Sequence, residues 1–245
     1  MAKPRPHLRN APMVEAVIDF RVLQREGLAA EVFAHLGELI GSRYGKGSVM
    51  QSIEGRFGLD RGQLINQTTV KPAVGWQYRT DTYVTQFRVD GFTFSKLQPY
   101  TTWEEVFGEA FRLWNIYIMQ AQPLEVSRIA VRYINRLGVP GPTDLRQYLE
   151  APPLLPPQLP QKLRAFLSRV LVEDSSRRAS AVLVQALEES LDPSLIPLLL
   201  DIDAYREVAL PPKDTALPDL FQQLRELKNE IFYASVTEKT VEMYA

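Results

Sequence analysis

Apolar and polar side chains alternate with a period of two in several segments, and this alternation constrains the fold more than any other feature. The clearest case is residues 14–22, in which every even position is apolar and the odd positions include Glu15, Asp19 and Arg21. A strand with this period presents one face to a core and the other to solvent. The sequence therefore predicts an antiparallel sheet with one covered face.

Further strands are predicted along the rest of the chain, where similar apolar segments are separated by turn signals such as Asp90-Gly91. They lie at residues 49–59, 63–69 with 76–79, 83–89, 92–97, 126–137, 163–172, 180–187 and 195–208. Pro197 has no N–H to donate, so the start of the last strand is expected at an edge or in an irregular segment. Helix is the alternative for residues 180–187, which are rich in Ala, Leu and Gln.

Apolar residues at three- and four-residue spacing predict three helices that would cover the sheet. The first spans residues 28–44 and ends at Gly45, the second follows a capping box formed by Thr102 and Glu105, and the third spans residues 217–231. Shorter segments are expected to be a helical stretch at residues 144–149, a proline-rich connector at 151–160 and a terminal turn at 237–244.

The predicted order is strand, helix, several strands and helix, and it occurs twice. We therefore expect an α+β fold of two similar units, residues 1–122 and 123–245, joined in one compact module. Each unit would have an antiparallel sheet with helices on one face. This order resembles the TATA-binding-protein-like topology, an analogy that carries no function with it.

Composition excludes several classes of site. The chain has no cysteine, so disulfides, thiol catalysis and thiolate metal sites are ruled out, and His7 and His35 are too few for a histidine-rich zinc site. Its formal net charge of −1 gives no overall field for nucleic acid or an anionic membrane. No segment has roughly 18 uninterrupted apolar residues. We expect a cytoplasmic protein without membrane association.

The candidate binding residues are arginines on the strand positions that point away from the predicted core, together with nearby acidic residues. The arginines are Arg21, Arg56, Arg128, Arg132 and Arg136. Such a face suits a protein partner or phosphate groups. The alternative is an ordinary solvated sheet face with cross-strand ion pairs.

A second hypothesis is a metal-dependent nuclease or another phosphate-processing enzyme. Asp201 and Asp203 share one side of a strand, and Glu15, Asp19 or Glu54 would supply a third ligand for Mg²⁺. Otherwise no catalytic residue, metal or cofactor is expected. A third hypothesis is a sequence-tolerant nucleic-acid binder, which the net charge does not favour.

Separated motifs give a family resemblance. They are residues 10–20 (NAPMVEAVIDF), 94–100 (FSKLQPY) with Trp103-Glu104-Glu105, 132–136 (RYINR), 229–232 (NEIF) and 237–239 (TEK). Together they resemble an uncharacterised bacterial family described as "sporadically distributed protein". The resemblance implies no activity, cofactor or catalytic residue. The patchy occurrence of that family implies a role in a mobile, toxin–antitoxin or phage-defence locus.

The leading functional hypothesis is therefore a non-catalytic interaction protein that binds a protein partner through its exposed sheet face or a sheet edge. A homo-oligomer is a further option. No nucleophile–base pair is evident in the sequence to support an enzyme instead.

Overall fold

The alternating segments assemble into one antiparallel sheet, in the order β2-β3-β4-β5-β1-β6-β9-β8-β7. The computed structural model describes residues 8–60, 63–141, 144–160, 163–188 and 194–245, while the side chains of residues 52–72 lie outside the description. The strand bounds are β1 Met13–Leu23, β2 Ser48–Asp60, β3 Gln63–Arg79, β4 Tyr83–Arg88, β5 Gly91–Leu97, β6 Glu125–Pro140, β7 Leu167–Asp174, β8 Ala179–Leu187 and β9 Leu195–Leu210.

Strands β1 and β6 join the two halves of the chain. They pair antiparallel from Met13 opposite Asn135 to Leu23 opposite Glu125, with register shifts near each end. The mixed helix-and-strand fold predicted from the sequence is confirmed, and the two halves share a single sheet.

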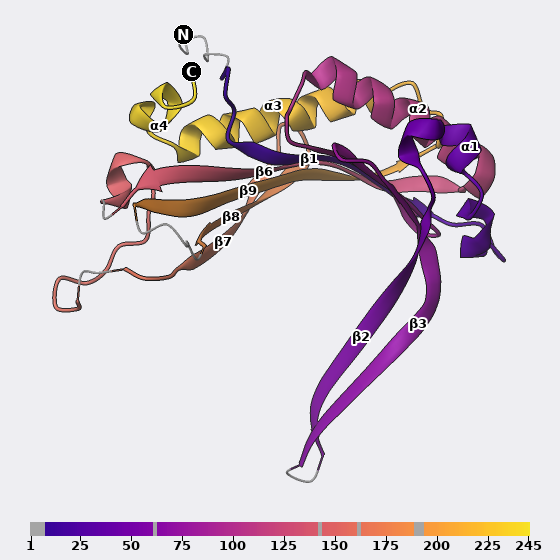
Figure 1. The fold of residues 1–245 in the computed structure, drawn as a ribbon, viewed down its shortest axis with the longest axis horizontal. Coiled ribbons are helices and arrows are strands. Elements are labelled where there is room, and N and C mark those ends of the chain that lie inside the picture. Colours follow the sequence, from indigo (N-terminus) through magenta and orange to yellow (C-terminus); the bar gives the residue numbers. More distant parts are fainter. Residues whose placement is uncertain (1–7, 61–62, 142–143, 161–162, 189–193) are drawn as a thin grey trace.

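Two long helices lie on one face of this sheet, α2 (Trp103–Ala121) and α3 (Leu217–Ser235) (Figure 1). The predicted capping box is present, because the Thr102 side chain accepts a hydrogen bond of 3.2 Å from the backbone N–H of Glu105. Shorter elements occur where short helical segments and a terminal turn were expected, namely η3 (Leu145–Gln147) and α4 (Glu238–Glu242). The sheet is thus covered on one side and open on the other.

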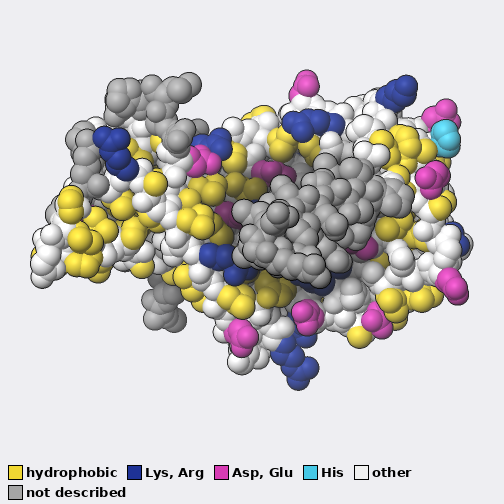
Figure 2. All heavy atoms as spheres, turned by 90° about the horizontal axis from the view of Figure 1, so that it is seen from below, with side chains coloured by type: hydrophobic (Ala, Val, Ile, Leu, Met, Phe, Trp, Pro, Cys, Tyr) yellow, Lys and Arg dark blue, Asp and Glu magenta, His cyan; other side chains and the backbone are white. Residues whose placement is uncertain are grey.

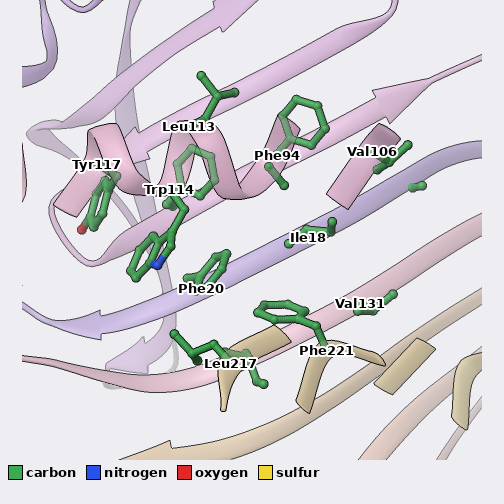
Figure 3. Close-up of a cluster of buried hydrophobic side chains, with 14 of the residues drawn as sticks. Ile18, Phe20, Phe94, Val106, Leu113, Trp114, Tyr117, Val131, Leu217 and Phe221 are labelled. Carbon is green, nitrogen blue, oxygen red and sulfur yellow. The ribbon is translucent and has the colours of Figure 1, made fainter. Parts of the chain in front are cut away.

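Aromatic side chains from both long helices meet the central strand in the core (Figure 3). Phe20 of β1 stacks on Trp114 of α2, with ring centroids 4.0 Å apart and planes within 7°. Phe221 of α3 approaches Phe20 at 4.8 Å. All three side chains are buried. The amphipathic stripes of the two helices therefore cover the sheet, as the spacing predicted.

The prediction of one helix over residues 28–44 is wrong. Three short pieces replace it: η1 (Ala30–Phe33), α1 (Gly37–Ile40) and η2 (Ser42–Tyr44). Tyr78 of β3 interrupts the helical hydrogen bonds, because its hydroxyl accepts from Leu36 N at 3.0 Å and donates to Phe33 O at 2.5 Å. Gly41 and Gly45 also have φ angles of 107° and 61°, which a helix does not allow.

The strand predictions hold with smaller corrections. β3 runs without the expected gap between residues 69 and 76, and β2 shifts register opposite the segment that contains Pro72. Such a bulge lets a proline occupy a strand. β7 begins four residues later than predicted, and residues 180–187 form strand rather than helix. The edge or irregular segment expected at Pro197 is not found, because Pro197 pairs with Gly138 in an unbroken β6–β9 register and its carbonyl accepts from Glu188 N at 2.9 Å. The proline is tolerated one residue beyond the last β8–β9 pair, Leu187 opposite Leu198.

The sheet is arched, and β2 and β3 extend past it as a two-stranded arm (Figure 1). The arm projects on the side opposite α2 and α3. We call this uncovered side the open face.

Glu109 of α2 accepts hydrogen bonds that tie the short helical pieces to the core. Its carboxylate receives the Tyr44 hydroxyl at 2.7 Å and Arg112 at 2.7 and 2.9 Å, and it pairs with Arg43. Burial opposes ionisation of Glu109, but these hydrogen bonds outweigh it and lower the pKa to about 2. Glu109 therefore stabilises the fold in its ionised form.

We predict that Glu109→Gln removes an acid-sensitive part of the stability. The folded-state pKa lies below the ordinary value of 4.5, so the stabilisation is complete above about pH 4.5 and is lost as the pH falls toward 2. After discounting for solvent screening, we expect the variant to lose about 1–2 kcal/mol at pH 7. Urea unfolding at pH 7 and pH 3 should show a smaller pH effect in this variant than in an exposed control, Glu31→Gln. Equal pH effects would contradict this role.

Candidate functional site

The charged residues predicted to point away from the core lie on the open face. In β6 these are Arg128, Arg132 and Arg136, and β9 contributes Asp201 and Asp203. Their orientation follows from the register, since the neighbouring positions Val131 and Ile202 are fully buried beneath the helices. In β1 the same face carries Glu15, Asp19 and Arg21. Figure 2, which looks onto this side, shows lysine and arginine side chains among hydrophobic and acidic ones.

A central hollow of about 470 Å³ opens on this face, across the two halves of the chain. Four arginines and two aspartates line it, which gives the lining a formal charge of +2. The lining residues are Val17, Asp19, Arg21, Gln86, Arg88, Thr93, Arg128, Ala130, Arg132 and Asp203. Two predicted binding positions from different strands, Arg21 and Arg128, are directly opposite each other in the β1–β6 register.

Asp19 contacts three of the arginines that line the hollow. One carboxylate oxygen, Oδ1, accepts a hydrogen bond from Thr93 Oγ1 at 2.5 Å and another from Arg88 Nη2 at 3.1 Å. The other, Oδ2, lies 3.5 Å from both Arg21 Nε and Arg128 Nη1, yet it is buried and makes no hydrogen bond within the described structure. A single carboxylate thus lies against three arginines.

Asp201 and Asp203 engage the arginines of β6. Arg132 forms a bidentate pair with Asp201, in which Nε donates to Oδ1 at 2.8 Å and Nη2 donates to Oδ2 at 2.6 Å. Arg128 donates to Asp203 at 3.0 Å and lies over the Tyr205 ring at 4.4 Å. Burial raises the pKa of Asp203, and the charges of Arg128 and Arg132 only partly oppose this. Both aspartates therefore act as acceptors for arginine in this structure.

The remaining predicted residues lie away from the hollow. Arg136 forms a separate two-pronged pair with Glu188, at 2.5 and 3.1 Å. Glu15 lies opposite Leu97 and Ile134, on the open face but outside the hollow's lining. The side chains of Arg56 and Glu54 lie outside the described residues, so the prediction made for them has no structural counterpart here.

The sequence analysis missed Arg88, which has the most contacts of the four arginines. Its guanidinium donates to Asp19, Asp90, Gln86 and Thr93, and its side chain is 10% exposed. A signal was present, because Arg88 alternates with the buried Phe87 in a predicted strand. The position of β4 near β1 is what brings Arg88 to Asp19, and strand order cannot be read from alternation.

The aspartates of the open face, Asp19, Asp201 and Asp203, are not arranged as a metal site. Within the described ranges, no group of three or more His, Asp or Glu side chains is arranged to hold a metal ion. Asp19, Asp201 and Asp203 instead contact arginines, which would repel a divalent cation.

No family model matches the sequence, and no curated protein matches it at a significant level. In addition, none of the helices in the described part of the chain has the length and apolar character needed to span a membrane.

Proposed function

We propose that this protein is a non-catalytic binding protein whose open face holds a protein partner. The main support for the proposal is the central hollow, in which arginines from β1, β4 and β6 lie together. Neither α2 nor α3 covers this hollow. Planar guanidinium groups held in place by carboxylates are well suited to recognise carboxylate side chains of another protein.

The charge balance favours a protein over a nucleic acid. Asp90 and Asp201, which are not part of the lining, pair with Arg21, Arg88 and Arg132, and these pairs offset the positive charge of the lining. A nucleic-acid backbone needs uncompensated cations along its path. A protein surface carrying charges of both signs can instead exchange ion pairs with this face without leaving one buried and unpaired.

The cellular setting remains part of the same proposal. The resemblance to the sporadically distributed bacterial family supports a role in a mobile, toxin–antitoxin or phage-defence locus, and we propose that the protein acts in the cytoplasm. In that setting the partner would be a protein encoded nearby.

We further propose that the two halves of the chain are a structural duplication with TATA-binding-protein-like topology. The sheet order supports this, because each half's last strand, β5 or β9, lies beside its first, β1 or β6, and the earlier strands follow outward. The helices α2 and α3 then each follow the last strand of their half, and each has 19 residues. The second half has one strand fewer.

Arg132→Glu is predicted to weaken partner binding at least tenfold. The substitution replaces a cation of the lining with a carboxylate, which repels acidic groups of the partner. We would capture partners from the native host with tagged wild-type and variant proteins and identify them by mass spectrometry. A partner retained by the wild type should be recovered in much lower yield with Arg132→Glu, as expected for a dissociation constant raised at least tenfold, or about 1.4 kcal/mol of binding free energy.

Arg146→Glu is the matched control, because Arg146 is also an exposed arginine in a two-pronged pair, with Asp144, but lies outside the hollow. Equal recovery with both variants would rule out the open face as the binding surface. Retention of nucleic acid, with affinity that falls steeply as salt rises, would support the nucleic-acid hypothesis instead. Mg²⁺-dependent cleavage lost in Asp201→Asn would support the nuclease.

A further inference from the structure

The sheet ends at β7 with an apolar edge that the rest of the described chain leaves uncovered. β7 pairs with β8 on one side, and its other side carries no strand among the described residues. Four of its apolar side chains are exposed, by 75% at Leu167, 45% at Val170, 51% at Leu171 and 39% at Val172. Because successive residues point to opposite faces, apolar surface is exposed on both sides of the strand.

Apart from the charges of Arg169, Glu173 and Asp174, this edge lacks the features that usually prevent strands from pairing. Residues 167–174 contain no proline or lysine. The β7–β8 register runs without a shift from Leu167 opposite Ala186 to Asp174 opposite Ala179, so no bulge turns the edge away. A regular, apolar and unpaired edge is a template for another strand.

We propose that a second copy of this chain covers the edge, by antiparallel pairing of β7 with β7 of the partner around a two-fold axis at Leu171. In this register Leu171 meets the partner's Leu171, and Val170 lies opposite the partner's Val172. Both contacts join exposed apolar side chains across the new strand pair. The proposal is independent of the function assigned to the central hollow.

Charge complementarity selects a second copy as the occupant and sets the register. Arg169 and Glu173 are exposed, lie on the same face of β7 and flank Leu171 by two residues on each side. In the described part of the chain neither belongs to an ion pair. With the axis at Leu171, each Arg169 lies opposite the partner's Glu173. With the axis at Arg169 or at Glu173, like charges would lie opposite each other. With the axis at Val170 or at Val172, Arg169 would not lie opposite Glu173.

The test is the oligomeric state of the full chain, measured by sedimentation equilibrium over a range of concentrations. The wild type should show a monomer–dimer equilibrium. Arg169→Glu and Glu173→Arg should each raise the dimer dissociation constant about tenfold or more, because like charges then oppose each other twice across the axis. The double variant with both changes should restore the wild-type constant.

Circular dichroism checks that the variants fold, and Arg146→Glu controls for a change of the same charge elsewhere on the surface. A wild type that remains monomeric at about 100 μM, well above the dissociation constants of stable dimers, would overturn the proposal. So would a dimer that the single charge reversals leave unchanged, or one that the double variant fails to restore.

Discussion

Trp114→Ala is expected to lower the free energy of unfolding by about 3–5 kcal/mol, the range typical of a large aromatic side chain deleted from a core. Trp114 is 1% exposed and stacks on Phe20 of the central strand. Its indole N–H also donates to Pro212 O at 3.2 Å, which ties α2 to the segment before α3. The deletion therefore leaves a cavity where both helices meet the sheet. Urea unfolding monitored by far-ultraviolet circular dichroism measures the loss.

Trp114→Phe is the matched control. It keeps an aromatic ring against Phe20 but removes the hydrogen bond to Pro212, so we expect a smaller loss of about 1–2 kcal/mol. If Trp114→Ala changed the free energy of unfolding by less than about 1 kcal/mol, the packing of α2 and α3 on Phe20 would not be a main source of stability.

Gly91→Ala is expected to cost about 3 kcal/mol or more, because the added carbon would collide with the backbone of the central strand. A Cβ at position 91 would lie 2.2 Å from Phe20 O, and neither strand can yield without disturbing the β1–β5 pairing. The loss would be measured by the same urea titration, together with the far-ultraviolet spectrum of the folded state.

Gly108→Ala is the same substitution at another glycine, and there it is expected to stabilise the protein. Gly108 lies inside α2, and a Cβ there would meet nothing within 4 Å. Alanine is the better helix former, so this variant should gain about 0.5–1 kcal/mol. Equal effects of the two changes would show that close packing at Gly91 does not determine the outcome.

Much of the candidate site could be predicted from alternation alone. Period two places Asp19, Arg128 and Asp203 on one side of their strands, whatever the order of those strands. It could not show that Asp19 would lie within reach of Arg88, which depends on β4 and β5 packing beside β1. Nor could it separate Arg136, which pairs with Glu188 away from the hollow, from the arginines that line it.

The local period of apolar residues was sufficient to predict most of the strands and the buried faces of α2 and α3, because both properties depend only on neighbouring positions in the chain. Only the tertiary structure decided the strand order, the hollow and the fate of residues 28–44. In that segment the helical spacing is present. The hydroxyl of Tyr78, more than thirty residues away, nevertheless bonds the backbone N–H of Leu36 and the carbonyl of Phe33, so these groups do not form helical hydrogen bonds. Such contacts depend on which distant residues meet, and a local pattern contains no information about them.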